Sequence, residues 1–347
     1  MHSIIGWDIG GAHLKAARLE NGRIVNVVQI ASPIWQGIDE LHRAFAEAKA
    51  LLGPAELNAA TMTAELSDAF PDRIAGVARI AEIARGELAP HRLLFYAGSA
   101  GLISPESVSG KAQAVASANW HASATFVARH FSEAVFADMG STTTDLIPIK
   151  GARVAARGYS DAERMAHGEL VYAGVVRSFL MAGLTLVPFA GRWVPLMNEW
   201  FANASDVYRI LGDLPDDADA MQTADGRPKT LEASRVRLAR QIGLDAKDAS
   251  SWALTLLARY FAEAQIRMIT DGAHLVLSHA DFGIEAPIIG AGVGRFVVKR
   301  LAERLGCAYV DFSDLIEAVP EMRHKVGDCA PASAVALLAA LEHPAFR

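Results

Sequence analysis

An internal repeat constrains the fold of this chain more than any other feature. Residues 5–16 align without a gap on residues 135–146, so that Asp8 falls on Asp138 and Gly10 on Gly140. In each copy an apolar run ends in Asp-x-Gly and is followed by a second apolar run. This pattern is typical of a strand, a tight turn and a returning strand. Two copies of one such unit predict two similar halves.

The turn in each copy has the composition of a phosphate-binding loop. Glycine lets the backbone approach an anion closely, and successive N–H groups form a concave site for it. The predicted phosphate-binding residues are Gly10, Gly11, Gly140, Ser141, Thr142 and Thr143. Lys15 would offer a cation to phosphate, whereas the matched position in the second copy holds Asp145.

The acidic residues of the repeat suggest a metal site. A carboxylate can hold a hydrated Mg²⁺, which keeps most of its waters and bridges to phosphate oxygens. We therefore expect Asp8 and Asp138 to project from the two halves toward one central Mg²⁺, with Asp145 as a further candidate ligand. A single Asp-x-Gly is usually an ordinary turn, and it is the duplication that favours the phosphate and metal interpretation.

A third glycine motif lies near the C-terminal end, where Gly290, Gly292 and Gly294 separate a short apolar run from a helical pattern. Glycine at a strand-to-helix turn permits close approach of a ligand, and the helix N-terminus favours an anion or a polar ring. These glycines are predicted to bind a nucleotide or a substrate. A tight packing turn is the alternative interpretation.

Apolar runs and helical periodicities alternate along most of the chain, which indicates an α/β fold. We expect one half over residues 1–133 and a second half over residues 134–347, with a helical insertion at about residues 180–260. After the insertion, residues 275–277 are expected to form a strand. Arg235, Arg237 and Arg240 are expected on a solvated helix face.

Composition excludes several classes of protein. A net charge of -6 argues against nucleic acid as a partner, since phosphate backbones need a basic face. Two cysteines cannot build a disulfide framework. The longest apolar stretch, residues 179–191, contains Pro188 and is too short to span a bilayer. The expectation is a cytoplasmic protein with no membrane partner.

The three glycine motifs, in this order, resemble those of the actin-like ATPase superfamily, which also holds sugar kinases and chaperone ATPases. Within it, residues 138–145 are similar to the second phosphate loop of the hydantoinase/oxoprolinase group. Residues 65–70, 118–122 and 323–328 resemble a narrower branch, found with tetrahydromethanopterin-linked one-carbon pathways, whose characterised relatives are methanofuran-type cofactor synthases. The resemblance implies an actin-like ATPase fold, with duplicated RNase H-like domains.

The resemblance also implies a Mg²⁺-dependent transferase. Such synthases join a furanylmethyl diphosphate to the phenol of a γ-glutamyl-tyramine and release diphosphate. The implied partners are therefore a small-molecule diphosphate and a phenolic acceptor, and Asp8, Lys15 and Asp138 would be catalytic. The turn at residues 290–292 lacks the paired glycines usual at the adenosine turn of the superfamily. ATP is accordingly left as an alternative ligand of the same loops.

Further candidate residues lie near two predicted elements. Trp120, after Asn119, would stack on a furan or phenol ring, and His121 would take the phenol proton. Glu65 and Asp68 follow a strand and are candidates for a base or for a partner of the substrate amine. The structural alternatives are a helix start with a packed tryptophan and a solvated loop.

Two other functions stay open at this point. One keeps the fold and makes the chain an ATP-dependent kinase or an amidohydrolase of the oxoprolinase type. The other is a non-enzymatic, actin-like nucleotide-binding module. A homo-oligomer is compatible with each of them.

Overall fold

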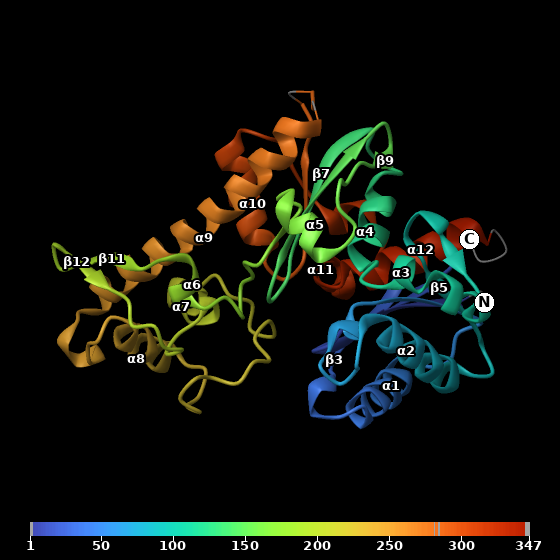
Figure 1. Cartoon of the computed structure of the whole chain (residues 1–347), viewed down its shortest axis with the longest axis horizontal. Coiled ribbons are helices and arrows are strands. Elements are labelled where there is room, and N and C mark those ends of the chain that lie inside the picture. Colours follow the sequence, from blue (N-terminus) through green and yellow to red (C-terminus); the bar gives the residue numbers. More distant parts are fainter. Residues whose placement is uncertain (1–2, 281, 284, 344–347) are drawn as a thin grey trace. The chain divides into compact units, whose positions relative to one another are not determined.

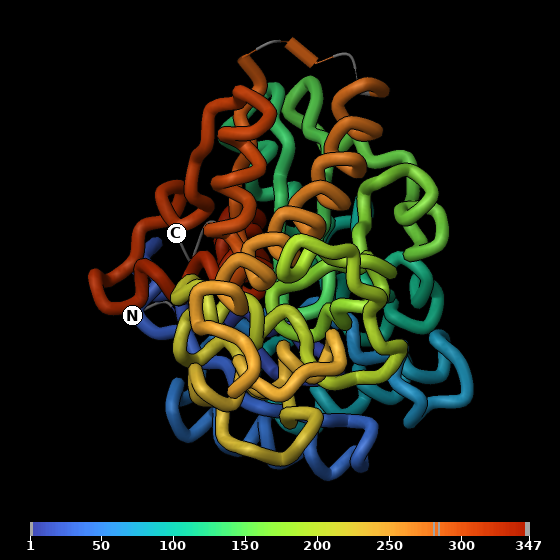
Figure 2. Tube along the Cα trace, turned by 90° about the vertical axis from the view of Figure 1, so that its left-hand side faces the viewer, coloured from blue at the N-terminus to red at the C-terminus, as the bar shows by residue number. Residues whose placement is uncertain are grey.

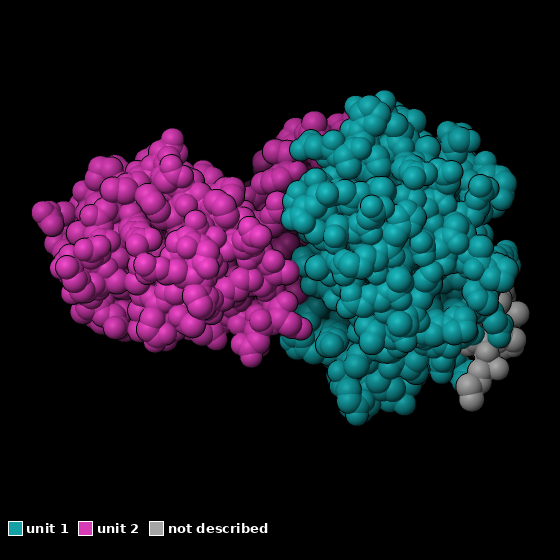
Figure 3. Space-filling model, turned by 90° about the horizontal axis from the view of Figure 1, so that it is seen from below, with its two compact units in different colours: residues 1–134, 149–154, 310–347 teal, residues 135–148, 155–309 magenta. Residues whose placement is uncertain are grey.

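The structure, a computed structural model, describes residues 3–280, 282–283 and 285–343 and divides the chain into two compact units (Figure 3). The first unit contains Met1–Ala134, Ile149–Val154 and Val310–Arg347, and the second contains Val135–Pro148 and Ala155–Tyr309. The first division, after Ala134, lies beside the predicted boundary. The C-terminal segment, however, groups with the first unit and not with the second.

The first unit is built on a six-stranded mixed sheet. In spatial order its strands are β3 (Arg23–Ala31), β2 (His13–Glu20), β1 (Ser3–Ile9), β4 (Leu57–Met62), β5 (Arg92–Tyr96) and β6 (Leu102–Ile103). β1 pairs antiparallel with β2 and parallel with β4. The predicted strand and returning strand are therefore present, and they are joined by the turn at Gly10 and Gly11.

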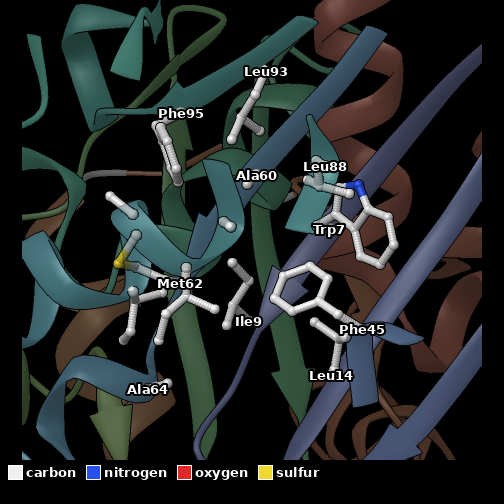
Figure 4. Packing of buried hydrophobic residues seen from close by; sticks show 14 of the residues in the cluster. Trp7, Ile9, Leu14, Phe45, Ala60, Met62, Ala64, Leu88, Leu93 and Phe95 are labelled. Carbon is white, nitrogen blue, oxygen red and sulfur yellow. The ribbon is translucent and has the colours of Figure 1, made fainter. Parts of the chain in front are cut away.

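The two faces of β1 pack against different helices. Trp7 lies on the face covered by α1 (Asp39–Leu52), where its ring centroid is 5.2 Å from that of Phe45 (Figure 4). On the other face Gly6 lies directly against α12 (Ala330–Glu342), because a Cβ at Gly6 would come within 2.1 Å of the Ala332 carbonyl oxygen. Side chains alternate along a strand, so Asp8 shares the α12 face with Gly6.

The second sheet repeats the plan of the first. Its strands, in spatial order, are β10 (Leu170–Val171), β8 (Thr144–Lys150), β7 (Glu133–Met139), β13 (Ile288–Ala291) and β14 (Tyr309–Asp311), with β9 (Arg153–Val154) also paired to β8. β7 is followed along the chain by its neighbour β8 and pairs parallel with β13, as β1 pairs with β2 and β4. The duplicated α/β arrangement predicted from the repeat is confirmed at the level of the sheets.

The helical insertion contains a small hairpin as well as helices. Its elements are α6 (Leu180–Gly183), β11 (Leu186–Phe189), β12 (Arg192–Pro195), α7 (Ala204–Leu211), α8 (Leu231–Gln241) and the first part of α9 (Ser251–Ala280). α9 runs as one unbroken helix of 30 residues (Figures 1 and 2). The predicted strand at residues 275–277 is wrong, because these residues lie inside α9.

The remaining helices join or cover the two sheets. They are α2 (Arg73–Leu88), α3 (Ala112–Val115), α4 (Asn119–Val127), α5 (Asp161–Ala166), α10 (Arg295–Leu305) and α11 (Arg323–Asp328). α12 packs on β1, β2 and β4 and on α4 within the first unit. In the part of the chain that the structure describes, no helix combines the length and hydropathy needed to cross a membrane.

Candidate phosphate- and metal-binding site

The loop after β1 is closed by a short hydrogen bond of its own. The Gly10 N–H donates to the His13 carbonyl oxygen at 3.0 Å, so the chain reverses within four residues. Asp8, one residue before the end of β1, is 5% exposed and pairs across the hairpin with Lys15 of β2. The predicted carboxylate and cation of the first loop therefore lie opposite one another. The Lys15 Nζ also donates to the Asp328 carbonyl oxygen at 3.5 Å.

The loop after β7 has the same geometry. The Gly140 N–H donates to the Thr143 carbonyl oxygen at 2.9 Å, the counterpart of the bond that closes the first loop. The hydroxyls of Ser141 and Thr142 lie 3.4 Å apart. Half-buried glycine and hydroxyl residues at this turn are suited to binding phosphate oxygens.

The correspondence extends to a third segment in each unit. The carbonyl oxygen of Ile9, next to Asp8, accepts from the Thr63 N–H at 2.9 Å, just beyond β4. The carbonyl oxygen of Met139, next to Asp138, accepts from the Gly294 N–H at 2.8 Å, just beyond β13. In each unit, the residue after the aspartate is thus hydrogen-bonded to the segment that follows the parallel neighbour strand. The third glycine motif occupies that matched place in the second unit.

Gly292 lies against the carboxylate of Asp138. It has a φ of +81°, and a Cβ there would come within 2.3 Å of the Asp138 Oδ1. Gly290 faces the ring of Tyr309, to which a Cβ would come within 2.5 Å. Close packing against a neighbouring residue therefore explains why glycine stands at both positions. Their predicted role in binding a nucleotide or substrate, shared with Gly294, stays a prediction.

Asp145 differs from its counterpart Lys15 in its surroundings. An oxygen of its carboxylate accepts a hydrogen bond from the buried Arg164 at 2.5 Å, and Arg164 also donates to the Glu169 carbonyl oxygen at 3.2 Å. A guanidinium partner of this kind competes with a metal ion for the carboxylate. The structure therefore favours an ion-pair role for Asp145 over the predicted metal-ligand role.

Glu65 is a buried carboxylate with one unsatisfied oxygen. It lies on a 3-10 turn (Ala64–Leu66) after β4, is 1% exposed, and accepts from the Ser117 hydroxyl at 2.6 Å. Among the described residues its Oε2 has no hydrogen-bond partner. Burial raises the pKa of Glu65, which makes it a stronger base than an ordinary glutamate. Asp68, by contrast, is exposed.

Asn119, Trp120 and His121 form the first turn of α4. The Trp120 side chain is packed in the first unit and only 2% exposed, which argues against the predicted stacking on a substrate ring. His121 Nδ1 lies 2.9 Å from the Tyr96 hydroxyl. Burial lowers the pKa of His121 to about 4, so its imidazole is neutral at pH 7 and weakly basic. Glu65 is consequently the better candidate for a proton acceptor.

The donors present fit a magnesium ion. Mg²⁺ typically takes one or two carboxylates and completes its shell with water and substrate phosphate. Asp8 and Asp138 each supply such a carboxylate beside a phosphate-type loop. Thr61 pairs with Asp8 across β1 and β4, and its buried Oγ1 has no hydrogen-bond partner in the described part of the chain. Within residues 3–280, 282–283 and 285–343, no cluster of three His, Cys, Asp or Glu forms a protein-only metal site.

Several residues of this region carried no clear signal in the sequence. Thr61, Ser117 and Tyr96 act through partners that are distant along the chain, so no local spacing marks them. Asp328 lies in a stretch already noted for its family resemblance, and the bond from Lys15 now places it near the first loop.

The chain is similar to known proteins over most of its length. Residues 56–319 match the family model of hydantoinase/oxoprolinase. A relative from Methanocaldococcus jannaschii is 28% identical over 297 residues, which cover 85% of this chain and 87% of the relative. It is named (4-{4-[2-(gamma-L-glutamylamino)ethyl]phenoxymethyl}furan-2-yl)methanamine synthase. A protein of the same name from Methanococcus vannielii is 27% identical over 51% of this chain and 78% of its own length.

A solved structure supports the fold. Acetone carboxylase in its nucleotide-free form superposes with a TM-score of 0.56 at 12% identity, over 96% of this chain and 70% of that chain. The architecture is the α/β actin-like ATPase fold that the resemblance of the glycine motifs implied. Since the family model covers well over half of the sequence, the chain belongs to the hydantoinase/oxoprolinase family.

Proposed function

We propose that the chain catalyses an ether-forming transfer in the biosynthesis of a methanofuran-type cofactor. The donor is a furanylmethyl diphosphate and the acceptor is the phenol of a γ-glutamyl-tyramine. The observation that carries this proposal is the match along 85% of the chain to a synthase whose name describes a product with a phenoxymethyl-furan ether. The paired phosphate-type loops support it, because the donor carries a diphosphate.

The reaction balances without an oxidant or a nucleotide. The phenol oxygen forms a bond to the methylene carbon of the donor, and the bond from that carbon to the diphosphate oxygen breaks. The electron pair of the broken bond leaves on the diphosphate, and the phenol proton passes to a base. Stabilising the negative charge that develops on the leaving group is therefore the main requirement of the site.

The residues of the two loops suit that requirement. The glycine turns, with Ser141, Thr142 and Thr143, would bind diphosphate oxygens, and Lys15 would offset part of their charge. Asp8 and Asp138 would hold Mg²⁺, which as a Lewis acid neutralises charge on the phosphates. Glu65, with its raised pKa and unsatisfied Oε2, is the proposed proton acceptor.

Purified protein tests this directly. With both substrates and Mg²⁺ it should form the ether and diphosphate in equal amounts, measured by mass spectrometry and a diphosphate assay. Asp138→Asn should lower kcat about 100-fold or more, as expected when charge stabilisation of the leaving group is lost. Asp271→Asn, at an exposed position on α9, is the control. Folded wild-type protein that yields neither product would refute the proposal.

Membership of the hydantoinase/oxoprolinase family favours a second candidate function. An ATP-dependent kinase or oxoprolinase-type amidohydrolase would use the same loops for ATP. Release of ADP that depends on a lactam or a small hydroxyl compound, with no ether formed from the diphosphate donor, would select it.

A further inference from the structure

The second unit contains a cavity of about 330 Å³ that none of the predicted roles uses. It lies between the chain that follows β10, the helix α7 and the middle of α9. Its walls are mainly apolar: the side chains that shape it include Tyr172, Phe179, Leu180, Val207, Phe261 and Met268. Tyr172, Phe179 and Met268 are exposed by 39% or more, so they form a mouth that reaches solvent.

The cavity adjoins the second phosphate-type loop. Thr142, a residue of that loop, also lines the cavity. Gly174 presses against the same loop, because a Cβ there would come within 2.4 Å of the Ser141 carbonyl carbon and the Thr142 nitrogen. The Arg177 N–H donates to the Ser141 carbonyl oxygen at 2.7 Å, and Arg177 also lines the cavity. A molecule bound on the loop therefore has the cavity directly beside it.

Two polar side chains in the wall of the cavity, Tyr208 and Gln265, bond to one another. The Tyr208 hydroxyl donates to the Gln265 Oε1 at 2.6 Å, and the Gln265 Nε2 donates to the Gly174 carbonyl oxygen at 2.9 Å. Because these hydrogen bonds are made within the protein, a bound molecule does not have to supply polar groups to satisfy these two side chains. The wall thus favours an apolar planar group over a sugar or another hydroxyl-rich ligand.

We propose that this cavity binds the aromatic ring of the diphosphate donor while the diphosphate lies on the loop at residues 140–143. The inference rests on the function proposed above. A ring joined through one methylene to the diphosphate would enter a space that begins at Thr142. A cavity of about 150 Å³ takes benzene, so the volume here suffices for a furan ring and its methylene. A polar substituent on the ring would extend through the exposed mouth.

Direct binding measurements separate this inference from the reaction itself. Titration calorimetry with Mg²⁺ would compare a furanylmethyl diphosphate with inorganic diphosphate. Ala264→Leu adds bulk from α9 into the cavity. It should weaken binding of the furanylmethyl compound about tenfold, the loss expected when a small apolar group is excluded. Binding of inorganic diphosphate should stay within about twofold of wild type, since no ring is involved.

Matched variants guard against a folding artefact. Ala253→Leu lies on the same helix but not in the cavity, and it should bind both compounds like wild type. Tyr172→Ala, at a position 55% exposed, removes part of the wall without filling it and should again weaken only the ring-bearing compound. Melting temperatures confirm that each variant is folded.

Three outcomes would overturn the assignment. These are an equal loss for both compounds in Ala264→Leu, no loss for either, or a loss confined to the KM of the phenolic acceptor. The last outcome would place the acceptor ring in the cavity instead. Failure of the wild-type protein to make the ether, with ring-dependent binding intact, would refute the reaction but not the ring site.

Discussion

At the scale of single residues, His121 gives the structure a defined dependence on pH. Burial lowers its pKa to about 4 in the folded chain, against about 6.5 when it is unfolded. Below pH 6.5 the unfolded chain takes up a proton that the folded chain does not, so the stability of the fold falls as pH falls toward 4. The full stability is present above pH 6.5, and the part of the unfolding free energy that is lost through His121 at low pH is about 3 kcal/mol at most.

His121→Gln should remove this dependence. The difference in unfolding free energy between wild type and the variant, from urea titrations at pH 7 and pH 4.5, should shift in favour of the variant at the lower pH. Other titrating groups are common to both proteins and cancel in the difference. If the unfolding free energy fell equally in both proteins between pH 7 and pH 4.5, the lowered pKa of His121 would be contradicted.

Gly174 provides a second test at this scale. Gly174→Ala would force a methyl group into the backbone of Ser141 and Thr142, and it should cost about 2 kcal/mol of stability through overpacking. The control is Gly86→Ala in α2, where a Cβ meets open space and alanine should stabilise the helix by about 0.5–1 kcal/mol. Thermal unfolding of both variants checks the prediction. Similar melting temperatures for the two would contradict it.

The sequence identified the residues whose signal is local. Asp8 with Gly10, and Asp138 with Gly140, follow strands that their own neighbours specify, and the matched hydrogen bonds of the two turns agree with that interpretation. The surroundings of Asp145 were not predictable in the same way. Its partner Arg164 is brought to it by the pairing of β10 with β8, which sequence spacing alone does not reveal.

At the scale of elements, the same distinction explains the strand that was wrongly expected at residues 275–277. The run Leu-Val-Leu is compatible with a strand or with the buried side of a helix, and three residues are too few to decide by period. Asp271-Gly272, just before that run, is a pair that typically marks a turn, yet α9 continues through it with Gly272 packed against Val171 and Gly168. Cooperative extension of an established helix then decides the conformation.

The insertion also holds a buried ion-pair network around Arg237, a residue that the sequence predicts on a solvated helix face. Arg237 of α8 was expected to face solvent, yet it is 1% exposed and donates to Asp206 of α7 at 2.7 Å and to Asp225 at 3.1 Å. The network fixes α8 to α7 and to the loop that precedes α8. Only the packing of these elements brings the charges together, so helical period could not reveal it.

Arg237→Met should therefore destabilise the insertion. It leaves two acidic groups without their shared cation, and removal of one partner of a buried pair costs about 3 kcal/mol or more. Arg267→Met on α9 is the control, because its pair with Asp271 is exposed and should contribute less than about 1 kcal/mol. Urea unfolding of both variants measures the difference. Equal stabilities would mean that the Arg237 network is energetically neutral.

At the scale of the whole molecule, the first unit depends on both ends of the chain. The Ile24 N–H donates to the Glu317 carbonyl oxygen at 2.8 Å, and α12 covers β1, β2 and β4. The sequence predicts two successive halves, with residues 310–347 in the second. A repeat shows that a structural unit occurs twice, but it does not show which of the two units a later segment packs against. The return of residues 310–347 to the first sheet is set by packing of α12 on apolar strands.

Deletion of residues 329–347 should consequently unfold the first sheet. Amide hydrogen exchange should lose protection in β1, β2 and β4, while β7 and β13 of the second unit keep most of theirs. Mass spectrometry of exchanged peptides gives both readings from one sample. Retained protection in β1 would show that the first sheet is stable without α12.

The position of α12 also has a consequence for biosynthesis. The strands it covers leave the ribosome well before α12, because β4 ends at Met62 and α12 begins only at Ala330. At a synthesis rate of about 5–20 residues per second, α12 is made on the order of ten seconds or more after those strands. One face of the nascent sheet, with Gly6 at its centre, is therefore open to chaperones or to other growing chains throughout that interval.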